Sequence, residues 1–257
     1  VAYDLASINV GITPALDAIA GAAENGIAVK PIGQFLAKFD DLLARCRRSD
    51  GPRRIVVIGG GAGGVELLLS VRTRLLKEAG GQGAEFTFAL VTAGDILETH
   101  NARVRDAFRR VFAERGIALH ERRSVHALRA SKVELEDGSS IDADATLVTT
   151  GAAAPSWFAG TGLVLDDGGF VAVSPTLQAL NDPDVFAAGD CAALVETPRE
   201  KAGVIAVRAG PPLAENLRLR ARGEPPKPWR PQRHHLALIS TGERYAVASR
   251  GWFKAEG

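Results

Sequence analysis

The segment Ile55-Val56-Val57-Ile58-Gly59-Gly60-Gly61-Ala62-Gly63-Gly64-Val65-Glu66 decides the fold of this chain. Its first four residues are all apolar, as in a parallel strand that is buried on both faces. A glycine-rich turn follows, and the apolar residues of 65–79 then recur at helical spacing. A strand, a turn and a helix in this order are the first half of a βαβ unit.

The spacing Gly59-x-Gly61-x-x-Gly64 gives this turn a chemical meaning. Gly59 permits the tight turn, Gly61 lets backbone approach a ligand, and Gly64 lets helix and strand pack closely. The N-terminus of the helix offers free N–H groups and a partial positive charge, which suit a pyrophosphate. We therefore predict that residues 59–66, including Glu66, bind a dinucleotide. A glycine-rich turn without a ligand is the alternative.

The segments after this turn predict an α/β domain. Residues 86–91 form a second apolar strand, and residues 101–115 have the pattern of an amphipathic helix. Residues 124–142 are typical of a β-meander with a turn at Asp137-Gly138, and residues 145–149 form another apolar strand. Parallel strands joined by right-handed crossovers follow from this order. We predict a Rossmann-like, doubly wound domain with a β-meander over residues 52–150.

The end of the second strand bears on which nucleotide binds. An NAD-binding unit usually has an acidic residue there, which accepts a hydrogen bond from the ribose 2′-OH. Thr92 stands at that place, with Asp95 close behind as a substitute, and no Arg occupies the strand end to attract a 2′-phosphate. We therefore expect a modest preference for NADH over NADPH.

Two further segments have the pattern of strand-end turns that approach a ligand. Gly11 and Gly151 each lie seven residues after an Asp, with an apolar strand between, although two unrelated turns would give the same pattern. In the third segment, an apolar strand ends at Gly189-Asp190. Gly189 allows close approach, and Asp190 can accept a charge-assisted hydrogen bond from a sugar-alcohol hydroxyl. A plain strand-end turn is the alternative there.

Composition excludes several classes of function. The 257 residues carry a formal net charge of +1, so no overall field favours nucleic acid as a partner. The two cysteines, Cys46 and Cys191, form no metal-binding or disulfide pattern. No apolar run reaches the roughly 18–20 residues that span a bilayer. We expect a cytoplasmic protein that binds no metal.

Together these motifs resemble the pyridine nucleotide–disulfide oxidoreductase superfamily, and the chain is similar to its type II NADH dehydrogenases. Lys30-Pro31-Ile32 and residues 231–251 resemble a bacterial subfamily that is often fused to selenophosphate synthetase. The resemblance implies FAD and NAD(P)H as cofactors, with Asp190 on the flavin ribityl chain. It implies hydride transfer from NAD(P)H to flavin and on to a small-molecule or quinone-like electron acceptor. A homodimer is compatible with the resemblance.

The departures from the superfamily limit the chemistry. The chain lacks the redox cysteine pair of disulfide reductases, and Cys191 beside Asp190 is most simply a small packed residue. Val204, Arg208 and Ala209 stand where type II NADH dehydrogenases carry glutamines near the quinone. Lys201 corresponds to the residue near the flavin pyrimidine ring, so it is a weak catalytic candidate, with a solvated lysine as the alternative.

The resemblance also implies how the chain divides. We expect residues 1–51 and 151–222 to be two segments of an FAD-binding domain, with the NAD(P)-binding domain 52–150 inserted between them. Residues 223–257 would be a linker and the start of a C-terminal domain. Only one Gly-rich loop occurs, so we expect the chain to be a fragment with an incomplete FAD domain. We expect this fragment to be inactive by itself. A peripheral position at a membrane is expected only for a longer protein. A non-catalytic docking module for a selenium-handling partner and a sulfide or selenide:quinone reductase are the alternatives.

Overall fold

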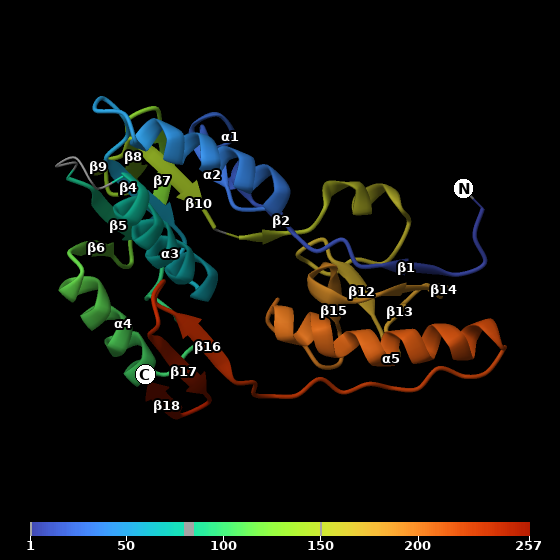
Figure 1. Ribbon diagram of the computed structural model, residues 1–257. Coiled ribbons are helices and arrows are strands. Elements are labelled where there is room, and N and C mark those ends of the chain that lie inside the picture. The colour runs from blue at the N-terminus through green and yellow to red at the C-terminus, as the bar shows by residue number, and fades with distance from the viewer. Residues whose placement is uncertain (1, 80–84, 150) are drawn as a thin grey trace. The chain divides into compact units, whose positions relative to one another are not determined.

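The central strand β4 (Arg54–Ile58) lies in the middle of a parallel sheet, as the sequence predicts. The computed structural model describes residues 2–79, 85–149 and 151–257 (Figure 1). The sheet has the order β3-β10-β4-β5-β6, with all strands parallel. Its other strands are β3 (Gly26–Ala28), β10 (Ala145–Val148), β5 (Thr87–Val91) and β6 (Ile117–His120).

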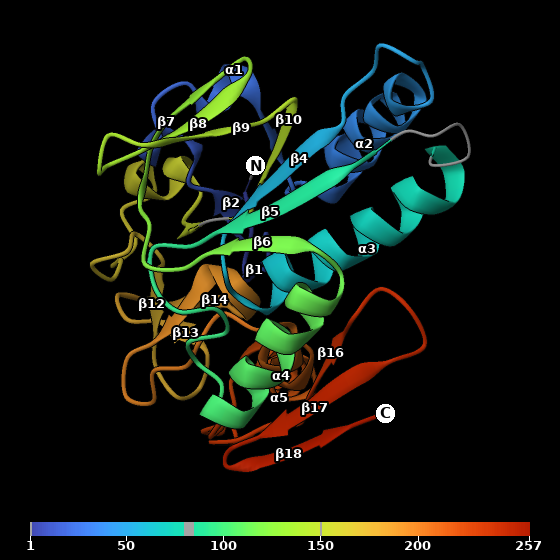
Figure 2. The ribbon, with the colours of Figure 1, turned by 90° about the vertical axis from the view of Figure 1, so that its left-hand side faces the viewer.

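Alternate residues of β4 enter two separate hydrophobic layers. Ile55 and Val57 pack with α2 (Ile32–Cys46), α3 (Ala62–Ala79) and α4 (Ala102–Glu114). Val56 and Ile58 pack with β7 (Val125–Arg129) and β8 (Lys132–Leu135), which form an antiparallel meander with β9 (Ser140–Asp142). Helices therefore cover one face of the sheet and the meander covers the other (Figure 2). The predicted α/β, Rossmann-like fold with a β-meander is confirmed.

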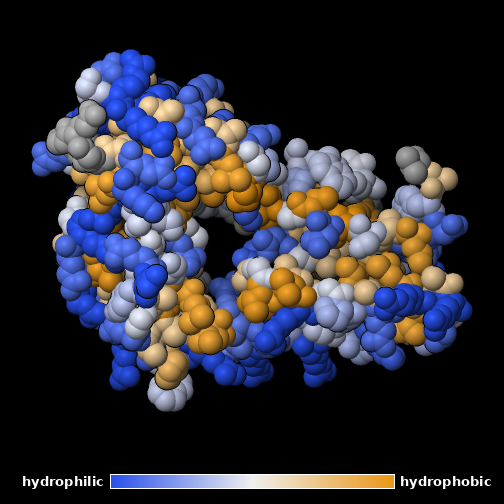
Figure 3. All heavy atoms as spheres, viewed as in Figure 1, coloured by the Kyte–Doolittle hydropathy of each residue, from blue (hydrophilic) through white to orange (hydrophobic). Residues whose placement is uncertain are grey.

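The C-terminal segment forms a small antiparallel sheet. It consists of β16 (Ala237–Ser240), β17 (Ala246–Arg250) and β18 (Phe253–Glu256). Ile239 and Val247 enter the same core as α3 and α4. Figure 3 shows hydrophobic residues gathered on the surface over these strands, and the exposed apolar side chains of the segment are Leu236, Leu238, Trp252 and Phe253.

A second group of elements forms its own sheet, of order β1-β14-β13-β12-β15. Its strands are β1 (Ala6–Ile8), β14 (Asp182–Ala187), β13 (Gln178–Ala179), β12 (Val171–Val173) and β15 (Ala192–Leu194). The short helices η2 (Ser156–Gly160) and η3 (Gly189–Cys191) and the long helix α5 (Gly203–Ala221) complete it. Phe158, Phe186 and Leu213 belong to its core. Two-residue strands β2 (Thr13–Pro14) and β11 (Ala152–Ala153) pair with each other.

The helix α5 continues through Pro211 and Pro212, although proline inside a helix usually kinks or breaks it. Each proline leaves the carbonyl four residues earlier without its usual donor. Those carbonyls belong to Val207 and Arg208, which are both exposed, and water can therefore satisfy them. None of the helices among the described residues is both long and apolar enough to span a membrane.

The chain divides into two compact units, and each contains segments from distant parts of the sequence. One unit joins residues up to Thr13 with Ala152–His235, and the other joins Pro14–Gly151 with Leu236–Gly257. The unit that contains Pro14–Gly151 includes η1 (Leu16–Ala18) and α1 (Ala22–Asn25). It is larger than the predicted domain 52–150 because β3 pairs with β10. We name the two units by their sheets, as the β14 unit and the β4 unit. Which unit binds which cofactor stays a prediction.

Candidate functional site

An open cavity of about 480 Å³ lies in the β4 unit, where strands β4 and β5 end. Parallel neighbouring strands bring their carboxyl ends to one edge, which is where ligands bind in open α/β sheets. Its lining comes from the loop 58–61, the strand end 91–94 and the segment 123–125, together with Ala15, Ala18, Ile19, Thr149 and Gly151. Two of the predicted loop residues, Gly59 and Gly61, therefore lie at this cavity together with Thr92 and Gly151.

The glycines of the loop have different structural roles. Gly59 has a φ of 121°, which L side chains rarely adopt. A Cβ added at Gly64 would lie 2.0 Å from the Gly59 carbonyl oxygen and 2.7 Å from Thr149 Oγ1, so Gly64 allows α3 to approach the sheet. A Cβ at Gly61 would meet no atom within 4 Å. The backbone at Gly61 is therefore open to a ligand, whereas Gly64 serves packing.

Thr92 packs directly against the loop. It is 9% exposed, and a Cβ at Gly60 would lie 2.5 Å from its Oγ1. The Gly60 carbonyl accepts a hydrogen bond from the Leu97 N–H at 2.7 Å, and Gly59 donates to the Val91 carbonyl at 2.8 Å. The sequence singled out Gly59, Gly61 and Gly64 but not Gly60, because its contact with Thr92 depends on the pairing of β4 with β5.

Glu66 lies on α3 with its carboxylate toward the C-terminal sheet. Its Oε1 accepts a hydrogen bond from the Ser240 N–H at 2.8 Å, and Glu66 is not among the residues that line the cavity. A Cβ at Gly242 would lie 2.5 Å from the Leu69 carbonyl, so the turn after β16 rests on the same helix. The predicted role of Glu66 in nucleotide binding stays untested, and its observed contact is structural.

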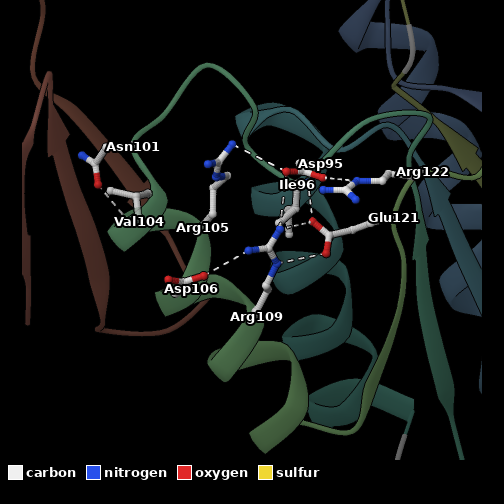
Figure 4. Close-up of polar contacts among 9 residues, drawn as sticks. All are labelled: Asp95, Ile96, Asn101, Val104, Arg105, Asp106, Arg109, Glu121 and Arg122. Carbon is white, nitrogen blue, oxygen red and sulfur yellow. Dashed lines mark hydrogen bonds and ion pairs between the residues drawn. The ribbon is translucent and has the colours of Figure 1, made fainter.

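Asp95 lies in a polar cluster beyond the cavity lining (Figure 4). Arg122 Nε donates to Asp95 at 2.8 Å, and this hydrogen bond lowers the pKa of the Asp95 carboxyl. Arg109 binds both oxygens of Glu121, at 2.9 and 2.8 Å, and Glu121 also accepts from the Ile96 N–H at 2.7 Å. This network holds the segment after β5 in place. Asp95 is engaged in it and is not among the residues that line the cavity, and its predicted substitution for Thr92 stays untested.

The other predicted glycines lie at strand ends with left-handed backbone. Gly151 has a φ of 67°, and a Cβ there would lie 2.7 Å from the Ala15 Cβ. Gly11 has a φ of 72° and follows β1 in the β14 unit. Gly189 has a φ of 75°, and a Cβ there would lie 2.5 Å from Asn9 Oδ1. Because β1 and β14 are parallel neighbours, they bring the segment 9–11 beside Gly189.

Asp190 and Lys201 line one small cavity of about 30 Å³ in the β14 unit. Asp190 is half-buried on η3. Lys201 Nζ donates to the Ala192 carbonyl at 2.7 Å and lies 3.8 Å from the centre of the Phe170 ring. Burial lowers the pKa of the Lys201 ammonium, although Asp166 and Asp190 act in the opposite direction. Lys201 is thus held at the cavity rather than free in solvent.

The family model that describes pyridine nucleotide-disulphide oxidoreductases matches residues 2–216. The chain belongs to the pyridine nucleotide-disulphide oxidoreductase family. As a member of this family, it is 25% identical over 211 residues to the mitochondrial internal alternative NAD(P)H-ubiquinone oxidoreductase A1 of Arabidopsis thaliana. That match covers 77% of this chain and 41% of the plant protein. Among the described residues, no group of His, Cys, Asp and Glu side chains is arranged to hold a metal ion.

Solved structures share the fold. NDH2 of Plasmodium falciparum in complex with NADH is 14% identical with a TM-score of 0.84, covering 100% of this chain and 71% of that chain. The sulfide:quinone oxidoreductase of Aquifex aeolicus is 20% identical with a TM-score of 0.78, covering 100% of this chain and 65% of that chain. The chain thus spans less than half of the curated plant relative and about two thirds of these two structures.

Proposed function

We propose that this chain supplies the nicotinamide-nucleotide site, and part of the FAD site, of an NAD(P)H-dependent flavin oxidoreductase. The observation that carries the proposal is the open backbone of Gly61 at the cavity where β4 and β5 end. The start of α3 lies at the same edge, and its first N–H groups have no partners within the helix. A pyrophosphate on residues 59–61 would accept hydrogen bonds from such groups.

The residues of the β14 unit have polar groups that suit a sugar-alcohol chain. Gly189 provides close approach, and Asp190 would accept a hydrogen bond from a ribityl hydroxyl. Lys201 carries positive charge to the same cavity, where it would stabilise negative charge on a ligand ring. FAD, when bound, supplies the redox chemistry between NAD(P)H and the final acceptor. The chain's own residues bind and orient, and no general base or nucleophile is required of them.

We propose a quinone-like or other small molecule as the final acceptor. The plant relative is named as a ubiquinone oxidoreductase, and the Aquifex protein as a quinone oxidoreductase. Chemistry on cysteine is disfavoured by this chain's thiols. Cys46 and Cys191 are both fully buried, and burial raises the pKa of each thiol, so neither is a reactive thiolate. This weighs against a sulfide or selenide:quinone reductase that uses them.

A docking module for a selenium-handling partner would share the nucleotide site but not the redox chemistry. Steady oxidation of NADH with an artificial acceptor, in protein whose bound FAD has been measured, would favour the enzyme. Nucleotide binding without oxidation would favour the docking module only in protein that carries FAD. A partnership with selenophosphate synthetase stays part of that second proposal.

The first prediction is that Gly61→Val abolishes NADH binding, because its side chain would occupy the space that the pyrophosphate needs. A Cβ at this position meets no atom within 4 Å, so the fold should persist. Isothermal titration calorimetry measures the affinity. Gly33→Val is the matched control, since a Cβ at Gly33 in α2 also meets nothing and Gly33 does not line the cavity. Unchanged NADH affinity in Gly61→Val would contradict the site.

A further inference from the structure

Arg123 is the charged side chain at the nucleotide cavity. Of the described residues that line this cavity, no other is charged, and none is an acid. Thr92 stands where an NAD-binding unit carries its ribose-binding carboxylate. Among the described residues, the cavity lining therefore carries no carboxylate and one guanidinium, which would attract a phosphate.

Arg123 lies directly beside Thr92, although 30 residues of chain separate them. The Arg123 N–H donates to the Thr92 carbonyl at 2.9 Å, just beyond the paired end of β5 and β6. In a Rossmann unit the ribose nearest the glycine-rich loop lies over the end of this second strand. Arg123 thus lies at the border of the cavity, beside the strand end that contacts the ribose in a Rossmann unit.

The Arg123 side chain is positioned by the meander. Its guanidinium forms an ion pair with Asp137, and both side chains are about half exposed. Asp137 is itself held in the turn between β8 and β9, where it accepts hydrogen bonds from the Ser139 N–H at 3.0 Å and its Oγ at 2.6 Å. A guanidinium has five donors in a planar fork. One carboxylate partner therefore leaves donors for a phosphate.

The neighbouring Arg122 serves a different purpose. It has a φ of 56°, and its Nε donates to Asp95 at 2.8 Å in the polar cluster. Arg122 is not among the residues that line the cavity. Substitution of each arginine in turn therefore distinguishes an effect of general positive charge from an effect of a guanidinium at the cavity.

We propose that Arg123 recognises an adenosine 2′-phosphate, so that this site prefers NADPH to NADH. The proposal rests on the proposed function of the same site, and it replaces the preference for NADH that the strand end alone suggests. The strand end contains no arginine, and the fold supplies one from the segment between β6 and β7. Arg is suited to this role because its planar fork matches phosphate geometry.

The test compares wild type, Arg123→Ala and Arg122→Ala. Each protein is titrated with NADPH and with NADH, and binding is monitored by nucleotide fluorescence. We expect wild type to bind NADPH more tightly, and Arg123→Ala to lose about tenfold or more in NADPH affinity, as expected for a charge-assisted phosphate contact. Its NADH affinity should change little. Arg122→Ala should keep the preference of wild type. Arg123→Gln, which retains the aliphatic stem and a polar end without the charge, should behave as Arg123→Ala does.

The competing outcomes are distinct. Equal or weaker binding of NADPH in wild type, or the same ratio of affinities in Arg123→Ala as in wild type, would overturn this inference while leaving the proposed function intact. Binding of neither nucleotide by wild type would overturn the proposed function itself. Titration with 2′,5′-ADP and 5′-ADP locates the effect, because only the first carries the 2′-phosphate, and Arg123→Ala should affect that one alone.

Discussion

The Asp144 carboxylate fixes the beginning of the central strand. Its Oδ2 accepts hydrogen bonds from the N–H groups of Arg53 and Arg54, each at 2.9 Å. Its Oδ1 binds the Arg54 guanidinium at 3.0 and 2.6 Å. Burial raises the pKa of this carboxyl, but the hydrogen bonds from Arg54 and the two N–H groups outweigh it and bring the pKa to about 2. The ionised form is therefore the one that stabilises the fold.

Asp144→Asn should destabilise the protein at neutral pH by about 2 kcal/mol, the free energy that corresponds to the depressed pKa. A carboxyl whose pKa is lower in the folded state contributes fully above its unfolded value near 4, and the contribution is lost as pH falls toward about 2. The difference between wild type and variant should shrink over that window. Urea unfolding midpoints at pH 7 and at decreasing pH measure it.

Asp142→Asn is the matched control for this prediction. Asp142 pairs with the same Arg54, at 2.8 Å, but its side chain is 71% exposed. An exposed ion pair contributes on the order of 0–1 kcal/mol. Equal destabilisation by the two variants, or an Asp144 effect that persists unchanged at low pH, would show that the hydrogen bonds to the strand are not the cause.

At the level of elements, α3 joins two parts of the β4 unit that the sequence keeps far apart. Gly61, the residue before this helix, lines the cavity, while Glu66 and Leu69 on the helix contact the segment 240–242. We expect Glu66→Ala to leave the Ser240 N–H without its acceptor and to increase hydrogen exchange in β16. Exchange followed by mass spectrometry measures this.

Glu66→Gln keeps an oxygen that accepts from Ser240, so exchange in β16 should stay close to wild type. If Gln loosens β16 as much as Ala does, the negative charge rather than the hydrogen bond holds the strand. If neither variant changes exchange, the contact does not hold β16 in place.

The strand, turn and helix around Gly59 and the meander of 124–142 were predictable because their signals are local: apolar periodicity, glycine spacing and a hairpin turn. The surroundings of Glu66 were not, because its partner Ser240 lies 174 residues away. The same holds for Arg123, which reaches the cavity only once β5 and β6 have paired. Sequence thus indicates which backbone segment can bind a phosphate. Which side chains reach that segment depends on the pairing of strands in the folded protein.

At the scale of the whole molecule, both units are assembled from separated segments. The β14 unit needs β1 from the first residues to pair with β14, at Ala6–Val185 through Ile8–Ala187. The β4 unit needs β3 and the C-terminal sheet around its central strands. The sequence predicted an inserted nucleotide domain, but the ends of that insertion depend on long-range pairing, such as that of β3 with β10.

This organisation leads to a prediction about cofactor content. Within these 257 residues, the segment around Gly59–Gly64 is the one glycine-rich turn with the spacing of a dinucleotide loop. An FAD pyrophosphate needs such a helix terminus of its own. Gly189 and Asp190 would contact only the sugar-alcohol part of FAD, and binding without pyrophosphate contacts should be weak. We therefore expect the 257-residue chain to bind nicotinamide nucleotide but to retain little FAD.

The measurement is the visible flavin absorbance of the purified chain after incubation with excess FAD and gel filtration, together with a nucleotide titration of the same sample. We expect far less than one flavin per chain and normal nucleotide binding. Because the two sites lie in different units, nucleotide binding should not depend on added FAD. Retention of one flavin per chain would show that the β14 unit holds FAD without a second loop. If the same sample also failed to bind NAD(P)H, the Gly59–Gly64 loop would have been assigned to the wrong cofactor.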